Sequence, residues 1–239
     1  MSALSYSDVL TQIAGLVPTN TTASDFLVMF PQAINDAEQR LYRELDLLNT
    51  TVRDSSAALS ANTRTLALPS VNGTFLVVDE INVITPAGQT NPDLGTRNPA
   101  TPSTPALLDF LWPSSVNATI PTYFARISDG TAVFGPWPDV GYQVEVVGTV
   151  RPASLSPTNV TTLLSTYFPD LLIAAMMVFV SGWMKNFGAA VDDPQMGVNW
   201  EAHYKQLLQS AATEEARKKF RAEGWSSASP SQIVSPPRT

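Results

Sequence analysis

The sequence contains no cysteine and only one histidine, His203, among its 239 residues. The absence of cysteine excludes disulfide bonds and thiolate nucleophiles. A single histidine without cysteine partners forms neither a catalytic triad nor a metal site. The sequence also has no glycine-rich loop of the kind that cradles phosphates. It therefore predicts no bound metal and no cofactor.

Charge is also scarce. Only 15% of the residues are charged, whereas about 25% is usual for a soluble protein. The formal net charge is −7, and the 14 basic residues form no strong run, which argues against a dedicated nucleic-acid binder. Such a surface is suited to lie near DNA without holding it. A surface with so few charges also needs ordered polar loops or partner proteins to cover it.

The longest uncharged apolar stretch, residues 171–184, is too short for a membrane span. A transmembrane helix needs about 20 apolar residues, and this stretch lies between Asp170 and Lys185. The first ten residues, MSALSYSDVL, lack the basic and apolar segments of a secretion signal. We therefore expect neither a membrane span nor an export signal.

The same stretch predicts a buried helix around which the chain is organised. Pro169 and Asp170 are typical of a helix start, because proline suits the first turn and a carboxylate there complements the helix dipole. Gly188 is a typical stop. A helix that is apolar on every side must be covered on every side. We expect neighbouring subunits to supply this cover, through Leu171, Leu172, Met176, Met177, Phe179 and Trp183.

Two helices are predicted before the middle of the chain. Residues 6–17 carry apolar side chains at helical spacing behind Ser5 and Asp8, which form a variant of the capping box. From Pro31 an amphipathic helix of about 18 residues follows. Ser24 is predicted to cap an earlier start, and Pro31 to kink or restart the helix.

Helices return after residue 150. A short helical turn is expected at 160–165, before the buried helix. A long helix is expected to open at Asp192-Asp193-Pro194, to run to about Ala222 and to end at Gly224. The pairs Glu214–Lys218 and Glu215–Lys219 have the i,i+4 spacing of ion pairs, and we expect them to mark its solvent-exposed side.

The middle of the chain is rich in Thr, Val, Pro and Gly and predicts four to six short antiparallel strands. Ser128-Asp129-Gly130 has the composition of a hairpin turn. Residues 86–119 form a long loop with one helical piece at 105–111, and a loop of this length is usually functional or ordered by a partner. The expected strands lie at 65–69, 75–85, 122–127, 131–134 and 142–150, and Phe124, Phe134, Trp137 and Tyr142 are expected in the core.

These segments predict an α+β fold: a helical bundle with an inserted antiparallel β domain and an extended C-terminal arm. Residues 225–239 of the arm are rich in Ser and Pro, uncharged until Arg238, and unable to form a core of their own. The expected parts are the first half of the helical part at 1–49, the β domain at 50–150, the second half of the helical part at 151–222 and the arm at 223–239.

An enzyme is the first alternative class. The adjacent acidic pairs Asp79-Glu80, Asp192-Asp193 and Glu214-Glu215 are its only candidates. Paired carboxylates cleave glycosidic bonds when they lie about 5–9 Å apart across a cleft, whereas neighbours in sequence point apart. We therefore predict no catalytic residues.

A tail fibre or receptor-binding protein is the second alternative, because a β-rich middle with many loops suits surface contact.

Three blocks of the sequence resemble the head-to-tail adaptor (connector) proteins of tailed bacteriophages. The first is residues 30–45, FPQAINDAEQRLYREL, similar to the second helix of that family. The second comprises PTYFARI at 121–127, FGPWP at 134–138 and YQVEV at 142–146, similar to its strands and Pro-containing turn. The third runs from Ser156 through FPDL at 168–171 to WEAHY at 200–204. The blocks cover most of the chain and share the order of the family's elements.

The resemblance implies a non-enzymatic virion protein at the head–tail junction, present in the host cytoplasm during assembly. Twelve subunits would form a ring below the portal protein and offer a platform to tail nozzle, tube or fibre proteins. The genome would pass through the lumen without specific binding. The C-terminal arm would clamp the portal through Trp225, Ile233 and Val234, because aromatic and aliphatic groups dominate interface energies.

Overall fold

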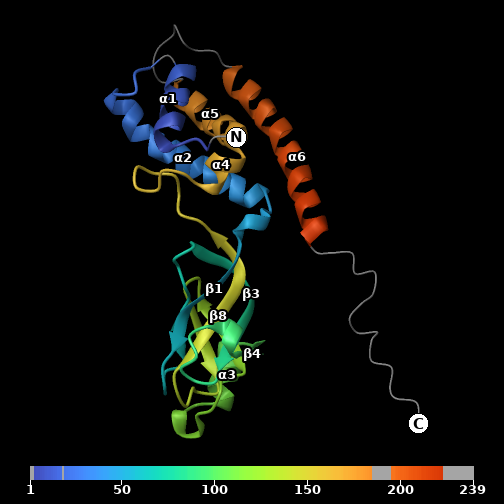
Figure 1. The fold of residues 1–239 in the computed structure, drawn as a ribbon. Helices are drawn as coiled ribbons and strands as arrows, with labels where there is room; N and C mark the ends of the chain where they lie inside the picture. Colours follow the sequence, from blue (N-terminus) through green and yellow to red (C-terminus); the bar gives the residue numbers. More distant parts are fainter. Residues whose placement is uncertain (1–2, 18, 185–194, 223–239) are drawn as a thin grey trace, which may run out of the picture. The chain divides into compact units, whose positions relative to one another are not determined.

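The chain forms two compact units, one helical and one built of strands (Figure 1). The computed structural model describes residues 3–17, 19–184 and 195–222. The helical unit comprises Met1–Leu48 and Ser154–Thr239, and the β unit comprises Asn49–Ala153. The predicted α+β class is confirmed. The division into domains at 1–49, 50–150, 151–222 and 223–239 stays a prediction, because independent folding of the parts is a property of the chain in solution.

The first two helices of the helical unit follow the expected pattern with two differences, both in the second helix. In α1 (Tyr6–Leu16), the Ser5 hydroxyl accepts a hydrogen bond from the Asp8 backbone N–H and the Asp8 carboxylate accepts one from Ser5 N–H, so the capping box is confirmed. Helix α2 (Ser24–Glu44) runs without interruption through Pro31. Ser24 is already its first helical residue and not its cap, which is Ala23.

Within its described residues, the helical unit has three further helices: α4 (Leu163–Tyr167), α5 (Pro169–Met184) and α6 (Met196–Ala222). The predicted starts at Pro169 and in the short turn before it are confirmed within a few residues. Gly188 and Asp192-Asp193-Pro194 lie outside the described residues. Among the residues that the structure describes, none of the helices combines the length and the apolar character that a membrane crossing requires.

Helix α5 is covered by its own chain. It packs against α1, α2 and α6, and these helices share one apolar core (Figure 1). Of the residues expected to meet a neighbouring subunit, four are at most 1% exposed within the single chain, whereas Phe179 and Trp183 are only partly buried. The four therefore need no neighbouring subunit to cover them. The four are Leu171, Leu172, Met176 and Met177.

The β unit contains more strands than expected. Eight strands form two four-stranded sheets, in the orders β1-β8-β3-β4 and β2-β7-β6-β5, and every pairing is antiparallel except that of β5 with β6. Strand β1 is not among the expected strands, and neither are β4 and β5, which lie in the segment expected to be a loop. The strands are β1 (Thr51–Leu59), β2 (Thr65–Ala67), β3 (Thr74–Thr85), β4 (Thr96–Pro99), β5 (Thr101–Pro102), β6 (Tyr123–Ser128), β7 (Thr131–Gly135) and β8 (Tyr142–Arg151).

The two sheets enclose the core of the β unit. Buried side chains from both sheets form one cluster, which includes Phe124, Phe134 and Tyr142 as predicted. Helix α3 (Pro105–Leu111) has the predicted bounds and packs Leu108 against β6 and β7. The indole of Trp137 is half-buried and donates to the backbone carbonyl of Trp112 over 2.9 Å. Short 3₁₀ turns at Leu48–Thr50, Pro92–Leu94 and Ser115–Asn117 complete the described elements.

A buried carboxylate in α2 holds the chain where it re-enters the helical unit. Glu38 is 2% exposed, and its Oε1 accepts a hydrogen bond from the backbone N–H of Leu155 over 3.2 Å. Burial raises the pKa of Glu38, and hydrogen bonds to its carboxylate oppose this effect only in part. The folded chain therefore favours the protonated form of Glu38 more than the unfolded chain does.

This arrangement predicts a pH-dependent stability. A carboxyl group with a raised pKa stabilises the fold below its unfolded pKa, and this contribution is lost as the pH rises through the folded pKa. Glu38→Gln keeps the acceptor for Leu155 and removes the titration, so its free energy of unfolding should fall less than that of the wild type as the pH rises from 4 to 7. Urea denaturation at several pH values measures this.

Two further variants make the test specific. Glu38→Ala leaves the buried Leu155 N–H without its acceptor and should cost about 1–3 kcal/mol. Asp36→Asn, an exposed carboxyl on the same helix, serves as the control and should follow the wild type. Parallel pH profiles for Glu38→Gln and the wild type would contradict the prediction.

Candidate interaction surfaces

An arginine clamp joins α2 to α6. The guanidinium of Arg40 donates two parallel hydrogen bonds to the Glu201 carboxylate, over 2.8 and 2.7 Å, and its Nε donates to Glu44 over 3.0 Å. It also lies 4.1 Å from the ring centroid of Tyr204, whose hydroxyl donates to Glu44 over 2.7 Å. Hydrogen bonds from Arg40 lower the pKa of Glu201. The clamp fixes the N-terminal half of α6 on α2.

A second set of polar contacts fixes the other end of α6. Glu215 is 5% exposed and accepts hydrogen bonds from the Leu48 N–H over 2.9 Å and from Lys218 over 2.7 Å. Lys219 forms an ion pair with Asp46. The predicted Glu214–Lys218 pair is present. The predicted Glu215–Lys219 pair on a solvent face is wrong, because Glu215 faces the segment that leaves α2 and Lys219 pairs with that segment.

A groove runs along one stripe of α6. Its α6 wall presents side chains spaced by three or four residues, which places them on one face of the helix. Its other wall comes from the start of the chain, α1 and the turn between α4 and α5, and Pro169 and Asp170 line both halves of the groove. We call this the α6 groove. Its lining comprises Trp200, His203, Leu207, Ser210, Ala211 and Glu214 on α6, and Leu4, Gln12, Tyr167, Phe168, Pro169, Asp170, Leu171 and Ile173 opposite.

The α6 groove is mainly apolar with acidic margins. Tyr167 is 58% exposed although it is aromatic, and its surface lies in the half of the groove near Glu214. Trp200 lies in the other half, with its ring centroid 5.8 Å from that of His203. The charged side chains that line the groove are Asp170 and Glu214, and no lysine or arginine of the described residues lines it.

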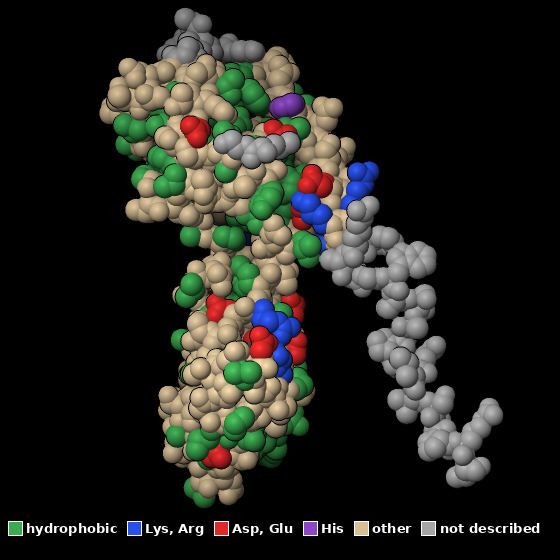
Figure 2. Space-filling view, viewed as in Figure 1, with side chains coloured by type: hydrophobic (Ala, Val, Ile, Leu, Met, Phe, Trp, Pro, Cys, Tyr) green, Lys and Arg blue, Asp and Glu red, His purple; other side chains and the backbone are tan. Residues whose placement is uncertain are grey.

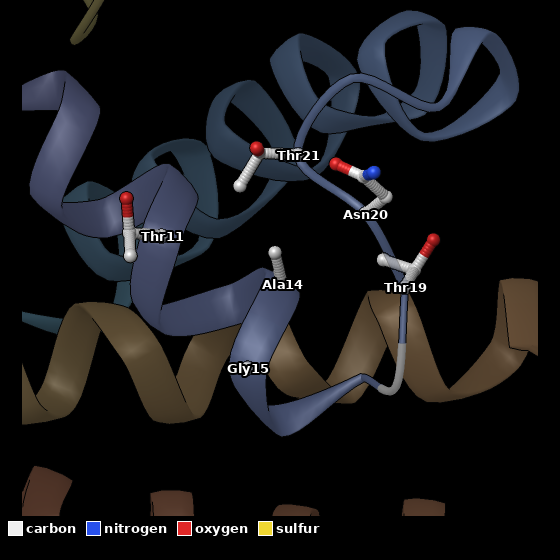
Figure 3. Close-up of a pocket in the computed structure, with 6 residues that line it drawn as sticks. All are labelled: Thr11, Ala14, Gly15, Thr19, Asn20 and Thr21. Atoms are coloured by element: carbon white, nitrogen blue, oxygen red, sulfur yellow. The ribbon is translucent and has the colours of Figure 1, made fainter.

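A second hollow, at the end of α1, is shallow and polar. Figure 3 shows Thr11, Ala14 and Gly15 on α1 facing the loop of Thr19, Asn20 and Thr21. The side-chain oxygen Oδ1 of Asn20 accepts hydrogen bonds from the Thr22 backbone N–H and hydroxyl, and the Thr11 hydroxyl donates to the backbone carbonyl of Ser7. These polar groups already have partners in their own loop and helix, and the lining carries no charge. We therefore assign no ligand to this hollow.

Charged side chains gather on one face of the β unit (Figure 2). Glu145 on β8 is 1% exposed and accepts hydrogen bonds from Arg53 on β1 and Arg97 on β4, while Asp93 pairs with Arg97. Burial opposes the charge of Glu145, but the two arginines outweigh it and lower its pKa. The cluster is neutral as a set and ties both edge strands to the centre of their sheet, so its role is structural.

An apolar patch covers the outside of α3 and the turn after it. The side chains of Phe110 and Val116 are 81% and 85% exposed, and those of Leu107 and Leu111 nearly half. The neighbouring Asp109 is paired with Arg64. We call the four apolar residues, Leu107, Phe110, Leu111 and Val116, the α3 patch. Clustered exposed apolar side chains of this kind mark sites of protein contact.

The residues considered for catalysis do not converge. Asp79 and Glu80 are exposed on β3, and Glu214 and Glu215 belong to the contacts at the end of α6. His203 lies on the exposed face of α6 beside Trp200. Within residues 3–17, 19–184 and 195–222 there is no group of three side chains that could hold a metal ion. Asp192-Asp193 and the predicted portal-binding residues Trp225, Ile233 and Val234 lie outside the described residues.

The chemistry of these surfaces is that of a protein that binds other proteins: paired charges fix the helices, and apolar surfaces remain open. A model of one protein family, described as the SU10 adaptor protein, matches residues 4–229. The match spans both units, and the chain therefore belongs to the SU10 adaptor protein family, a family of phage head-to-tail adaptors and hence of structural virion proteins. The comparison with curated proteins found no match.

The arginine clamp leads to a stability prediction. Arg40→Ala removes the two hydrogen bonds to Glu201, the bond to Glu44 and the contact with the Tyr204 ring, and should lower the free energy of unfolding by about 1–3 kcal/mol, since the group is partly exposed. Arg40→Lys cannot make the two parallel bonds, so its free energy of unfolding should lie between those of Arg40→Ala and the wild type. Chemical denaturation monitored by circular dichroism measures this.

The matched control is Arg43→Ala on the same helix. Arg43 is exposed and, among the described residues, donates to Gln39 in the preceding turn, so its removal should change stability by less than about 0.5 kcal/mol. Equal effects at both positions would show that the clamp does not hold α6.

Proposed function

We propose that the protein forms a ring of twelve subunits below the portal, joins the capsid to the tail and continues the DNA channel. The single observation that supports this most is the family match across both units. The alternative of a tail fibre or another tail component has no separate support from the described surfaces.

The helical unit provides the side that meets the portal. The contacts of Glu215 and Lys219 fix the last turns of α6, so the arm at 223–239 starts from an anchored point. Its aromatic and aliphatic residues Trp225, Ile233 and Val234 would become ordered on the portal. A segment that orders on binding embraces a large partner at the cost of some affinity per unit of area.

Neighbouring subunits meet through the remaining apolar surface of the helical unit. A closed ring needs two different patches on each subunit that fit each other. Phe179 and Trp183, which are only partly covered, form one candidate patch on α5. Leu16 at the end of α1 is 44% exposed, and Leu27 and Val28 near the start of α2 are 43% and 72% exposed; these three residues form another.

The charge of the protein suits a channel through which DNA moves. The net charge is −7, and the arginines 40, 53, 64 and 97 are engaged with carboxylates of their own chain. Arginines that are paired in this way make few phosphate contacts and release few counterions. DNA would therefore pass without being retained.

Negative-stain imaging of the purified chain mixed with the portal ring of its phage tests the proposal. We expect a ring-shaped extension on the portal, whose symmetry gives the copy number. A 1–222 truncation keeps every contact described above and should retain its circular dichroism spectrum but lose portal binding. Trimeric spikes, or a folded protein that never associates with portal, would overturn the adaptor function in favour of a fibre component, and unchanged binding by the truncation would exclude the arm as the clamp.

The α3 patch is the proposed contact for a tail protein. Its residues lie on the surface of the β unit, and α3 is held there by the buried Leu108, so the patch is presented on a fixed support. Phe110→Asp should leave the melting temperature nearly unchanged, because the side chain is 81% exposed, and should weaken association of the portal–adaptor complex with tail proteins by at least tenfold.

Val71→Asp is the matched control for this variant. Val71 is an equally exposed apolar residue of the β unit, at 82%, outside the α3 patch. Co-sedimentation of each variant with assembled tails measures the association. Equal losses for the two variants, or none for Phe110→Asp, would contradict a role for the patch.

A further inference from the structure

The α6 groove is an open apolar surface of the single chain. Its course along α6 indicates which segment covers it. Its α6 wall is formed by the stripe that includes Trp200, His203, Leu207, Ser210 and Glu214. One stripe on a helix continues to the end of that helix, so the groove points along α6 toward Ala222, where the arm begins.

We propose that, in the subunit before assembly, residues 223–239 of the same chain fold back along α6 and occupy this groove. The contact deepens the proposed function, because the arm would be covered by its own subunit until the portal displaces it. The contact between the arm and the groove forms without the portal. Only its role, which is to delay binding of the arm to the portal, depends on the proposed function.

The lengths of the two segments match. A helix rises about 1.5 Å per residue, so Glu214 lies about 12 Å and Trp200 about 33 Å back along α6 from Ala222. An extended chain covers about 3.4 Å per residue. Trp225 therefore reaches about 10 Å, close to the half of the groove that contains Tyr167 and Glu214, and Ile233 reaches about 37 Å, as far as the half that contains Trp200.

The chemistry of the two segments also matches. Apart from Glu223, its first residue, the arm carries no acidic side chain. It offers Trp225, Ile233 and Val234 as apolar side chains, and from Trp225 onward Arg238 is its one charged side chain. The groove offers apolar walls with Asp170 and Glu214 as its charged lining and no lysine or arginine among the described residues. Burying apolar arm residues in it removes apolar surface from water without leaving a charge unpaired.

The tether favours the arm of the same chain over the arm of a second copy. A segment attached a few residues from its site has an effective concentration in the millimolar range. A second subunit at micromolar concentration therefore competes poorly for the groove.

Cysteine crosslinking tests the contact, since the natural chain contains no cysteine. The pair Ser210→Cys with Ser226→Cys places one thiol in the groove and the other beside Trp225. The control pair is Ala212→Cys with Ser226→Cys, because Ala212 is exposed and lies about 200° around the helix from Ser210. Circular dichroism first verifies that both full-length variants are folded.

With a short bismaleimide reagent and no portal, we expect a crosslink within the monomer at a yield about tenfold above the control pair. Mass spectrometry of the linked peptides identifies it. A crosslink between two subunits would assign the groove to a second copy and overturn the proposal. Equal yields for the two pairs would overturn it as well.

The variant Ser210→Arg tests whether the contact between the arm and the groove slows binding to the portal. An arginine at this exposed position fills the groove, frees the arm and should raise the rate of portal association by up to about tenfold. An unchanged rate of portal association would show that the contact does not delay binding to the portal. If no variant and no wild-type protein bound portal, the proposed adaptor function would fail, while the crosslinking result would still decide the contact.

Discussion

The cover of α5 is the constraint on which the helical unit depends. This helix is apolar on every side, and α1, α2 and α6 enclose it. Helix α6 contributes Tyr204 and Ala211 to the shared apolar core, and two buried or half-buried charge clusters add to its docking. Arg40 holds one end and Glu215 the other. Loss of either cluster would open the side of α5 that α6 covers.

The same contacts prepare α6 for its proposed work. Glu215 and Lys219 attach the last turns of α6 to residues 46–48, so the described part of this helix ends at a fixed position in the helical unit. The groove beside α6 then offers the arm a place within its own subunit. A surface that covers apolar side chains before assembly and releases them on the portal would prevent early association without any change in the fold.

The β unit is held together by different contacts. Its two sheets share an apolar core, and Glu145 joins the edge strands β1 and β4 through Arg53 and Arg97. These charges neutralise one another within the unit. The apolar surface on α3 therefore stands out as the candidate contact surface of the β unit, on a support that is fixed by burial of Leu108.

The sequence by itself determined the elements whose signals are local: the capping box at Ser5 and Asp8, helix 105–111, and the hairpin around Asp129, because their hydrogen bonds join residues within a few positions of one another. It also carried the family resemblance. Only the tertiary structure decided what covers α5, that Glu215 is buried against Leu48, and that residues 51–59 form a strand. That strand is rich in small polar residues, and its partner β8 lies about 90 positions away. Partners so distant leave no periodic pattern in the sequence, so burial and pairing alone identify them.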